Sequence, residues 1–117
     1  MAEHARLICA SSDLADGGDG VRFEIDEAGV KKSAFAIRHR SRVHAYHNRC
    51  GHVPVELDWQ HGRFFDMTGL YLICATHGAL YDPSSGRCIG GRCNGKGLDP
   101  LKVVERNGSI YLVEGKT

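Results

Sequence analysis

Alternation between apolar and polar residues is the feature of this chain that most constrains its fold. Val21, Phe23 and Ile25 are separated by charged residues, which is the period-two pattern of a strand with one buried face. Similar short runs follow at 34–37, 43–46, 70–73, 101–105 and 109–113. No segment keeps a helical periodicity for three turns. The sequence therefore predicts an all-β domain of short antiparallel strands that closes as a sandwich or barrel.

Turn-forming residues separate these runs. Asn107-Gly108 lies between the last two and predicts a tight hairpin, because both residues tolerate positive φ. Residues 16–20, 82–86 and 90–97 are further glycine-rich or polar breaks, and only residues 12–15 suit a brief helical turn. No repeat or linker interrupts the pattern, so residues 1–117 are expected to form one domain.

The composition narrows the functional class. Charged residues make up 25% of the chain and the net charge is +1, which gives no reason to expect nucleic-acid binding. No apolar run approaches the roughly 20 residues of a membrane helix, and the N-terminus lacks a signal peptide, so a cytoplasmic protein is expected. Five cysteines and seven histidines are unusual in 117 residues. In a reducing compartment such cysteines favour metal or redox chemistry.

Two short motifs carry candidate metal ligands. Residues 50–52 are Cys-Gly-His and residues 74–77 are Cys-Ala-Thr-His, so each motif offers a thiolate and an imidazole to one metal centre. Each follows a predicted strand, which places two ligand-bearing loops at strand ends. Gly51 and Gly78 allow the backbone to approach a cluster and to offer N–H donors to its sulfurs.

Two cysteines and two histidines could equally form a tetrahedral zinc site. Zinc modules usually pair two cysteines on one loop and two histidines on another. The mixed Cys-x-His and Cys-x2-His spacing seen here is unusual for them, and zinc is therefore the alternative rather than the main hypothesis.

Beyond the two motifs, the chain resembles the Rieske family. The Cys-x-His motif is followed after 21 residues by Cys-x2-His-Gly, which is similar to the Rieske signature. The segment 81–86, Tyr-Asp-Pro-Ser-Ser-Gly, is similar to the turn that follows the second ligand loop in that family. Residues 12–14, 100–101 and 107–108 also fit, so the resemblance covers nearly the whole chain and is closest to stand-alone Rieske ferredoxins.

The resemblance implies a stacked-sheet Rieske-like domain with two cluster-binding loops at one end and one 2Fe–2S cluster. Cys50 and Cys74 would bind one iron, and His52 and His77 the other. The implied function is one-electron transfer between a reductase and an oxygenase or other terminal reductase, through transient protein contacts. No catalytic residue is expected, because a catalytic oxygenase would need a second domain. A zinc-stabilised binding module and a cluster-based redox sensor remain the alternatives, and the oligomeric state stays open.

Departures from the family pattern favour a low reduction potential. Rieske potentials span about −150 to +300 mV, and the high-potential members carry an additional cysteine in each ligand loop, which this chain lacks. Ala79 stands where those members have a serine hydroxyl against the cluster. Tyr81 stands where many low-potential relatives have phenylalanine. We therefore expect a low-potential centre that the Tyr81 hydroxyl raises somewhat.

The remaining segments carry weaker expectations. Glycines at 89–97 replace a Gly-Pro loop of the family, and residues 58–65 are expected to form a protruding loop over a small satellite core. That core would contain Trp59, Phe64 and Phe65. Cys9 is expected to be a small core residue, and Cys88 and Cys93 to be free thiols, with a disulfide or redox switch as the alternative.

Five histidines have no cysteine at ligand spacing, and most of them are expected to face solvent or to be capped. These are His4, His39, His44, His47 and His61. The segment 31–49 contains six basic and no acidic residues, which we interpret as exposed strand positions and a turn. The alternative is a basic face that steers an acidic redox partner.

Overall fold

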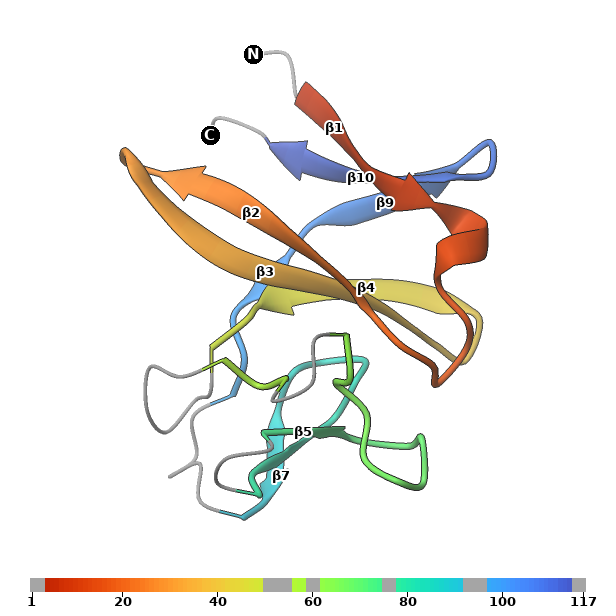
Figure 1. The fold of residues 1–117 in the computed structure, drawn as a ribbon, viewed down its shortest axis with the longest axis vertical. Helices are drawn as coiled ribbons and strands as arrows, with labels where there is room; N and C mark the ends of the chain where they lie inside the picture. Colours follow the sequence, from red (N-terminus) through yellow and green to blue (C-terminus); the bar gives the residue numbers. More distant parts are fainter. Residues whose placement is uncertain (1–3, 50–55, 59–61, 75–77, 92–96, 115–117) are drawn as a thin grey trace.

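The computed structural model describes residues 4–49, 56–58, 62–74, 78–91 and 97–114, which form three stacked antiparallel sheets (Figure 1). The first sheet has the order β1-β10-β9 and comprises β1 (His4–Ala10), β10 (Ser109–Glu114) and β9 (Val103–Arg106). The central sheet comprises β2 (Val21–Glu27), β3 (Val30–His39), β4 (Arg42–His47) and β8 (Pro100–Leu101). The third comprises β5 (Leu72–Ile73), β6 (Leu80–Tyr81) and β7 (Cys88–Gly90). The all-β prediction is confirmed.

Strand β3 is buried on both faces because it lies in the middle layer. Ala34 and Ala36 pack toward the first sheet, and Phe35 and Ile37 pack toward the third, all with fully buried side chains. Alternation of small and large side chains thus allows one strand to serve two cores. This explains why its sequence is a continuous apolar run rather than an amphipathic one.

The first sheet holds both ends of the described chain. His4 pairs with Glu114 across β1 and β10, and the predicted Asn107-Gly108 hairpin joins β9 to β10 with φ values of 51° and 78°. Strand β1 was not predicted from alternation. A 3-10 turn, η1 (Ser11–Asp13), follows it and overlaps residues 12–15, where a brief helical turn was expected.

Arg38 ties the first sheet to the central one. Its guanidinium donates to both carboxylate oxygens of Glu105 at 3.0 and 2.6 Å and to the carbonyls of Ser11 and Leu14. The Arg38 hydrogen bond holds the pKa of the Glu105 carboxyl down, to about 2. One half-buried ion pair therefore links β3 to β9 and to the turn that follows β1.

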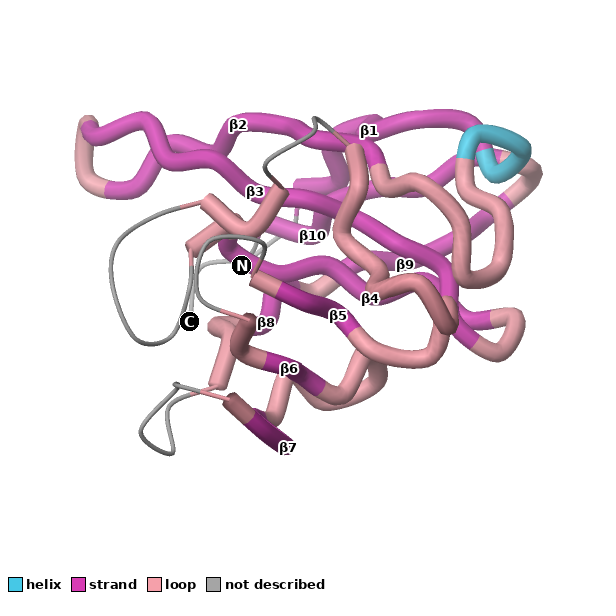
Figure 2. Tube along the Cα trace, turned by 60° about the horizontal axis from the view of Figure 1, so that its bottom comes forward, coloured by secondary structure: helices cyan, strands magenta, loops and turns pink. Residues whose placement is uncertain are grey.

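The third sheet packs on the large side chains of β3 and β4. Figure 2 shows β5, β6 and β7 as neighbouring short strands beneath the central sheet. Phe64 stacks on Phe35 with ring centroids 4.0 Å apart, and Tyr46 donates from its hydroxyl to the Pro83 carbonyl at 2.7 Å. The same core contains Leu57, Leu72, Cys74, Ala79, Tyr81 and Leu98.

The expectation of a protruding loop at residues 58–65 was wrong for its described residues. Asp58 is 4% exposed and Phe64 is fully buried. Phe64 belongs to the main core between the second and third sheets rather than to a satellite core, and Phe65 packs against it. The physical reason is that the aromatic ring and the paired carboxylate both gain more by packing inward. Trp59 lies outside the described residues.

His39 also departs from expectation, because it is buried. Strands β3 and β4 point His39 and His44 toward the third layer, where the His39 ring stacks on Phe65 with centroids 6.2 Å apart. Burial lowers the pKa of His44. His47 is paired with Glu27, as a capped histidine would be. Across the described ranges there is no helix long and apolar enough to cross a membrane.

Candidate metal centre

Cys74 directly follows strand β5 and is the one predicted ligand that lies within the described ranges. Its side chain is fully buried and is not disulfide-bonded. The Cys74 N–H donates to the Ala79 carbonyl at 2.9 Å, and the Gly78 N–H donates to the Cys74 carbonyl at 2.7 Å. These two bonds join Cys74 to the residues at which the described chain resumes, Gly78 and Ala79. A thiol at a strand end, held at both backbone atoms, suits a fixed metal ligand.

Gly78 and Gly91 form a close contact beside these bonds. Gly78 has a φ of +71° and open space where a Cβ would lie, so its backbone can be approached there. A Cβ added at Gly91 would lie 2.6 Å from the Gly78 carbonyl oxygen and 2.8 Å from the Ala79 Cα. The chain after β7 therefore packs directly on the backbone of the second ligand segment.

The segments that flank the first ligand motif share a core with Cys74. Leu57 follows that motif, and its side chain is fully buried in the same cluster as Cys74 and Ala79. The His47 N–H, on the other side of the motif, donates to the Asp99 carbonyl at 2.9 Å. The fold therefore brings the bases of both ligand-bearing segments to one end of the molecule.

Cys50, Gly51, His52 and His77 lie outside the described residues, so the full ligand set stays a prediction. Within the ranges that are described, no three His, Cys, Asp or Glu residues gather as a metal site. The one described ligand fits a thiolate-bound cluster, because the Cys74 side chain is buried and not disulfide-bonded, and open space lies at the Cβ position of nearby Gly78.

Ala79 and Tyr81, the residues expected to tune the potential, are both fully buried beside Cys74 in the third layer. Ala79 offers no hydroxyl, in agreement with the low-potential expectation. Tyr81 lies in β6, opposite Leu72 of β5. Its predicted hydrogen bond toward the cluster remains a prediction.

The expectation of a free Cys88 thiol was wrong. Cys88 is disulfide-bonded, and its partner lies outside the described residues. Disulfide formation depends on the distance between two Cβ atoms in the fold, which sequence spacing does not report. Cys9 is not disulfide-bonded and packs, partly buried, against the core between the first and central sheets, as expected of a small core residue. Burial raises the pKa of its thiol.

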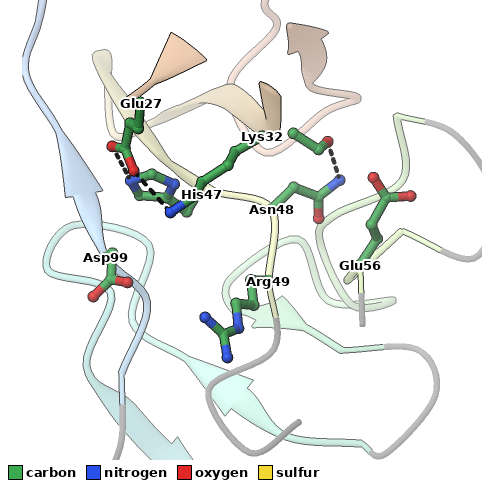
Figure 3. A pocket seen from close by; sticks show the side chains of 8 residues that line it. Glu27, Lys32, His47, Asn48, Arg49, Glu56 and Asp99 are labelled. Carbon is green, nitrogen blue, oxygen red and sulfur yellow. Dashed lines mark hydrogen bonds and ion pairs between the residues drawn. The ribbon is translucent and has the colours of Figure 1, made fainter. Parts of the chain in front are cut away.

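A pocket of about 500 Å³ lies beside the first ligand segment, and most of the side chains that line it are charged. Figure 3 shows Glu27 between His47 and Lys32, at 3.3 and 3.0 Å. The Lys32 hydrogen bond lowers the pKa of Glu27. Since Lys32 is paired here and Arg38 is paired with Glu105, the basic run at 31–49 does not form a uniformly positive face.

Sequence reasoning missed two buried polar residues at this end of the molecule, Asn48 and Asp58. They are 4% exposed each and hydrogen-bond to one another across the first ligand segment. An isolated asparagine and aspartate in a polar stretch give no periodic signal. The only available hint was that Asn48 lies two residues before Cys50.

Comparisons with known proteins agree with this geometry. The chain is similar to the ferredoxin of carbazole 1,9a-dioxygenase from Nocardioides aromaticivorans IC177, with 22% identity, a TM-score of 0.69, and coverage of 96% of this chain and 98% of that one. It is also similar to a ferredoxin of Sphingomonas yanoikuyae B1, with 15% identity, a TM-score of 0.71, and coverage of 97% and 100%.

The same fold occurs within larger proteins. The terminal oxygenase of carbazole 1,9a-dioxygenase from Nocardioides aromaticivorans IC177 matches 97% of this chain at 18% identity and a TM-score of 0.71, but only 31% of the oxygenase is covered. At these identities the structures show a shared fold. Comparison with curated protein sequences gives no significant match.

The family itself is shown by the sequence. The profile of the Rieske [2Fe-2S] domain matches residues 4–110, which is nearly all of the described chain. A Rieske domain holds one 2Fe–2S cluster, a one-electron centre, and this favours iron–sulfur over zinc as the cofactor of this chain. The chain belongs to the Rieske [2Fe-2S] domain family.

Proposed function

We propose that this chain is a Rieske-type ferredoxin, a one-electron carrier that moves electrons from a reductase to an oxygenase or another terminal reductase. The observation that carries the proposal is the correspondence with two ferredoxins over at least 98% of their length. The match to the terminal oxygenase, in contrast, covers only 31% of that chain, so the length of this chain corresponds to the ferredoxins rather than to the oxygenase.

In the proposed site, Cys50 and Cys74 hold one iron and His52 and His77 hold the other. Two thiolates balance the charge of the oxidised cluster, so accepting an electron is easier than with four thiolates. Cys74 supports this assignment from the structure, because it is buried and fixed by the backbone hydrogen bond to Ala79. The other three ligands are supported by their spacing in the sequence alone.

The acceptor is proposed to be an oxygenase component. One similar solved structure is a complex of reduced oxygenase and oxidised ferredoxin in carbazole 1,9a-dioxygenase, at 21% identity and a TM-score of 0.72. A mixed-charge surface beside the first ligand segment, with Glu27, Lys32, Arg49 and Asp99, would favour a weak and transient contact.

Ligand substitutions test the proposal. We expect the purified protein to be coloured and to take up one electron per cluster, and we expect Cys50→Ser and Cys74→Ser to lose the cluster. Cys9→Ser is the matched control, since Cys9 is a free and partly buried cysteine in the first core. A colourless protein that contains zinc, or a cluster retained in both ligand variants, would refute the assignment.

A further inference from the structure

A buried amide–carboxylate pair joins the chain before the first ligand segment to the chain after it. Asn48 lies two residues before Cys50, and Asp58 lies six residues after His52. The Asn48 amide donates from Nδ2 to Asp58 Oδ1 at 2.9 Å, and each residue is 4% exposed. The bond spans ten residues of chain and encloses both proposed ligands of the segment.

Asn48 makes further hydrogen bonds at this position. Its Oδ1 accepts from the Leu57 N–H at 2.9 Å, and its Nδ2 also donates to Ser33 Oγ at 3.3 Å. The Asn48 N–H donates to the Ser33 carbonyl at 2.9 Å. Asn48 therefore joins the two sides of the ligand segment to one another and to strand β3.

Asp58 anchors the outgoing side in the same way. Its second carboxylate oxygen, Oδ2, accepts from the Gly62 N–H at 3.0 Å and lies 3.5 Å from Arg22 Nε. Arg22 also pairs with Glu56 at 2.5 Å, so strand β2 contacts the chain directly after the ligand segment. The residues on either side of the segment are thus fixed to β2 and β3, two neighbouring strands of the central sheet.

We propose that Asn48 and Asp58 act as a loop clamp, a pair of positioning residues that presets the proposed ligands Cys50 and His52 for the cluster. The inference rests on the proposed ligand set and concerns residues to which the family match assigns no role. A buried pair with every side-chain polar atom bonded restricts the ends of the segment, because breaking one partner leaves the other unsatisfied. Restricted ends favour one geometry of the ligands between them.

Three variants test the loop clamp. Asn48→Asp places two carboxylates against one another at the 2.9 Å contact. Asp58→Asn either places two amide NH2 groups against one another there or leaves the Gly62 N–H without its acceptor. The swap N48D/D58N restores the contact between the two side chains, because the new amide at 58 donates to the carboxylate at 48, which also accepts from Leu57. The swap does not restore the ion pair of residue 58 with Arg22. We expect each single variant to lose the cluster to an iron chelator about tenfold faster than the wild type, and the swap to recover most of that loss.

A distant ion pair supplies the control for general destabilisation. Glu105→Gln weakens the Arg38 pair that joins the central sheet to the first sheet, on the face away from the ligand segments. At matched thermal stability we expect Glu105→Gln to retain the cluster as the wild type does. We also expect Asn48→Asp and Asp58→Asn to change the electron paramagnetic resonance line shape of the reduced cluster, which Glu105→Gln should leave unchanged.

The loop clamp is refuted if the single variants lose the cluster no faster than Glu105→Gln and keep the wild-type line shape, or if the swap restores nothing. Asp58→Asn adds no buried charge, whereas Asn48→Asp does, so Asp58→Asn keeps the test valid if Asn48→Asp fails to fold. Failure of the proposed ligand set is a different result: the wild type itself would lack a histidine-ligated cluster, or Cys50→Ser would retain it.

Discussion

Two buried residues beside Cys74 are expected to set the reduction potential. Ala79 provides no hydroxyl, whereas Tyr81 places a phenol in the same core cluster as Cys74. A hydrogen bond to a cluster sulfur stabilises the reduced form, because the added electron makes the sulfur a better acceptor. The low-potential hypothesis and the Tyr81 contribution therefore have separate tests.

Tyr81→Phe should lower the midpoint potential by about 20 to 65 mV, the equivalent of one ordinary hydrogen bond in a one-electron couple. Protein-film voltammetry measures it. Tyr46→Phe is the matched control, since it removes a buried hydroxyl that donates to the Pro83 carbonyl instead. An unchanged potential in Tyr81→Phe would remove the tyrosine from the account.

Ionisation of Glu105 makes the free energy of unfolding depend on pH in the acid range. The folded-state pKa of its carboxyl is about 2, below the ordinary value of 4.5, because Arg38 donates to it. A depressed pKa contributes stability that is present above pH 4.5 and is lost as the pH falls toward 2. The free energy of unfolding of the wild type should therefore approach that of Glu105→Gln over this interval.

Urea unfolding of the two proteins at pH 7, 4.5 and 3 measures the effect. The difference between wild type and Glu105→Gln should be largest at pH 7 and smallest at pH 3. A difference that stays constant across these pH values would contradict the coupling of Glu105 to Arg38.

At the scale of elements, the contact between Gly91 and the backbone of Gly78 and Ala79 leaves no room for a larger residue at position 91. Gly91→Ala would place a Cβ 2.6 Å from the Gly78 carbonyl oxygen, so the backbone of the second ligand segment would have to shift. Gly108→Ala is a closely matched control, because its φ of +78° nearly equals the +77° of Gly91 but nothing lies within 4 Å of the new Cβ.

Both variants should lose about 1 to 2 kcal/mol of stability from the left-handed backbone, and only Gly91→Ala should also lower the iron and sulfide content per folded protein. Thermal unfolding and metal analysis distinguish the two effects. Equal cluster content in both variants would show that the contact at Gly91 does not support the ligand segment.

The elements that sequence alone predicts are those with enough length for a pattern. Strands β2 and β4 follow from alternation, β3 from its apolar run at 34–37, and the β9–β10 hairpin from Asn107-Gly108. Strand β5 lies within the predicted apolar run at 70–73, whereas β6 and β7 have two and three residues, too few for any periodicity, and the third sheet exists because its side chains pack on Phe35 and Tyr46. Long-range packing of this kind has no local signal.

The site shows the same division. Cys74 and Tyr81 could be proposed from spacing and resemblance, because ligand motifs are local in sequence, and their roles stay predictions. The bond between Asn48 and Asp58 was not identified, because it forms across ten residues only after the chain has folded. His39 was misjudged for the same reason: the third layer, which covers it, is absent from the sequence pattern.

On the scale of the whole molecule, the paired chain ends and the proposed ligand Cys74 lie on opposite sides of the central sheet. The first sheet pairs both ends of the described chain, His4 with Glu114, and the third sheet carries Cys74 at the opposite side of the central sheet (Figure 1). The central sheet supplies one core to each neighbour through the alternating faces of β3.

The most direct test of the central claim is pulsed electron paramagnetic resonance of the dithionite-reduced protein. Ligation by Cys50, His52, Cys74 and His77 predicts a reduced 2Fe–2S cluster with two coupled histidine nitrogens. Substitution of His52 or His77 by cysteine should remove one coupling each, whereas His61→Ala should remove none. A cluster without nitrogen coupling, or a protein that holds zinc and no reducible cluster, would contradict the account.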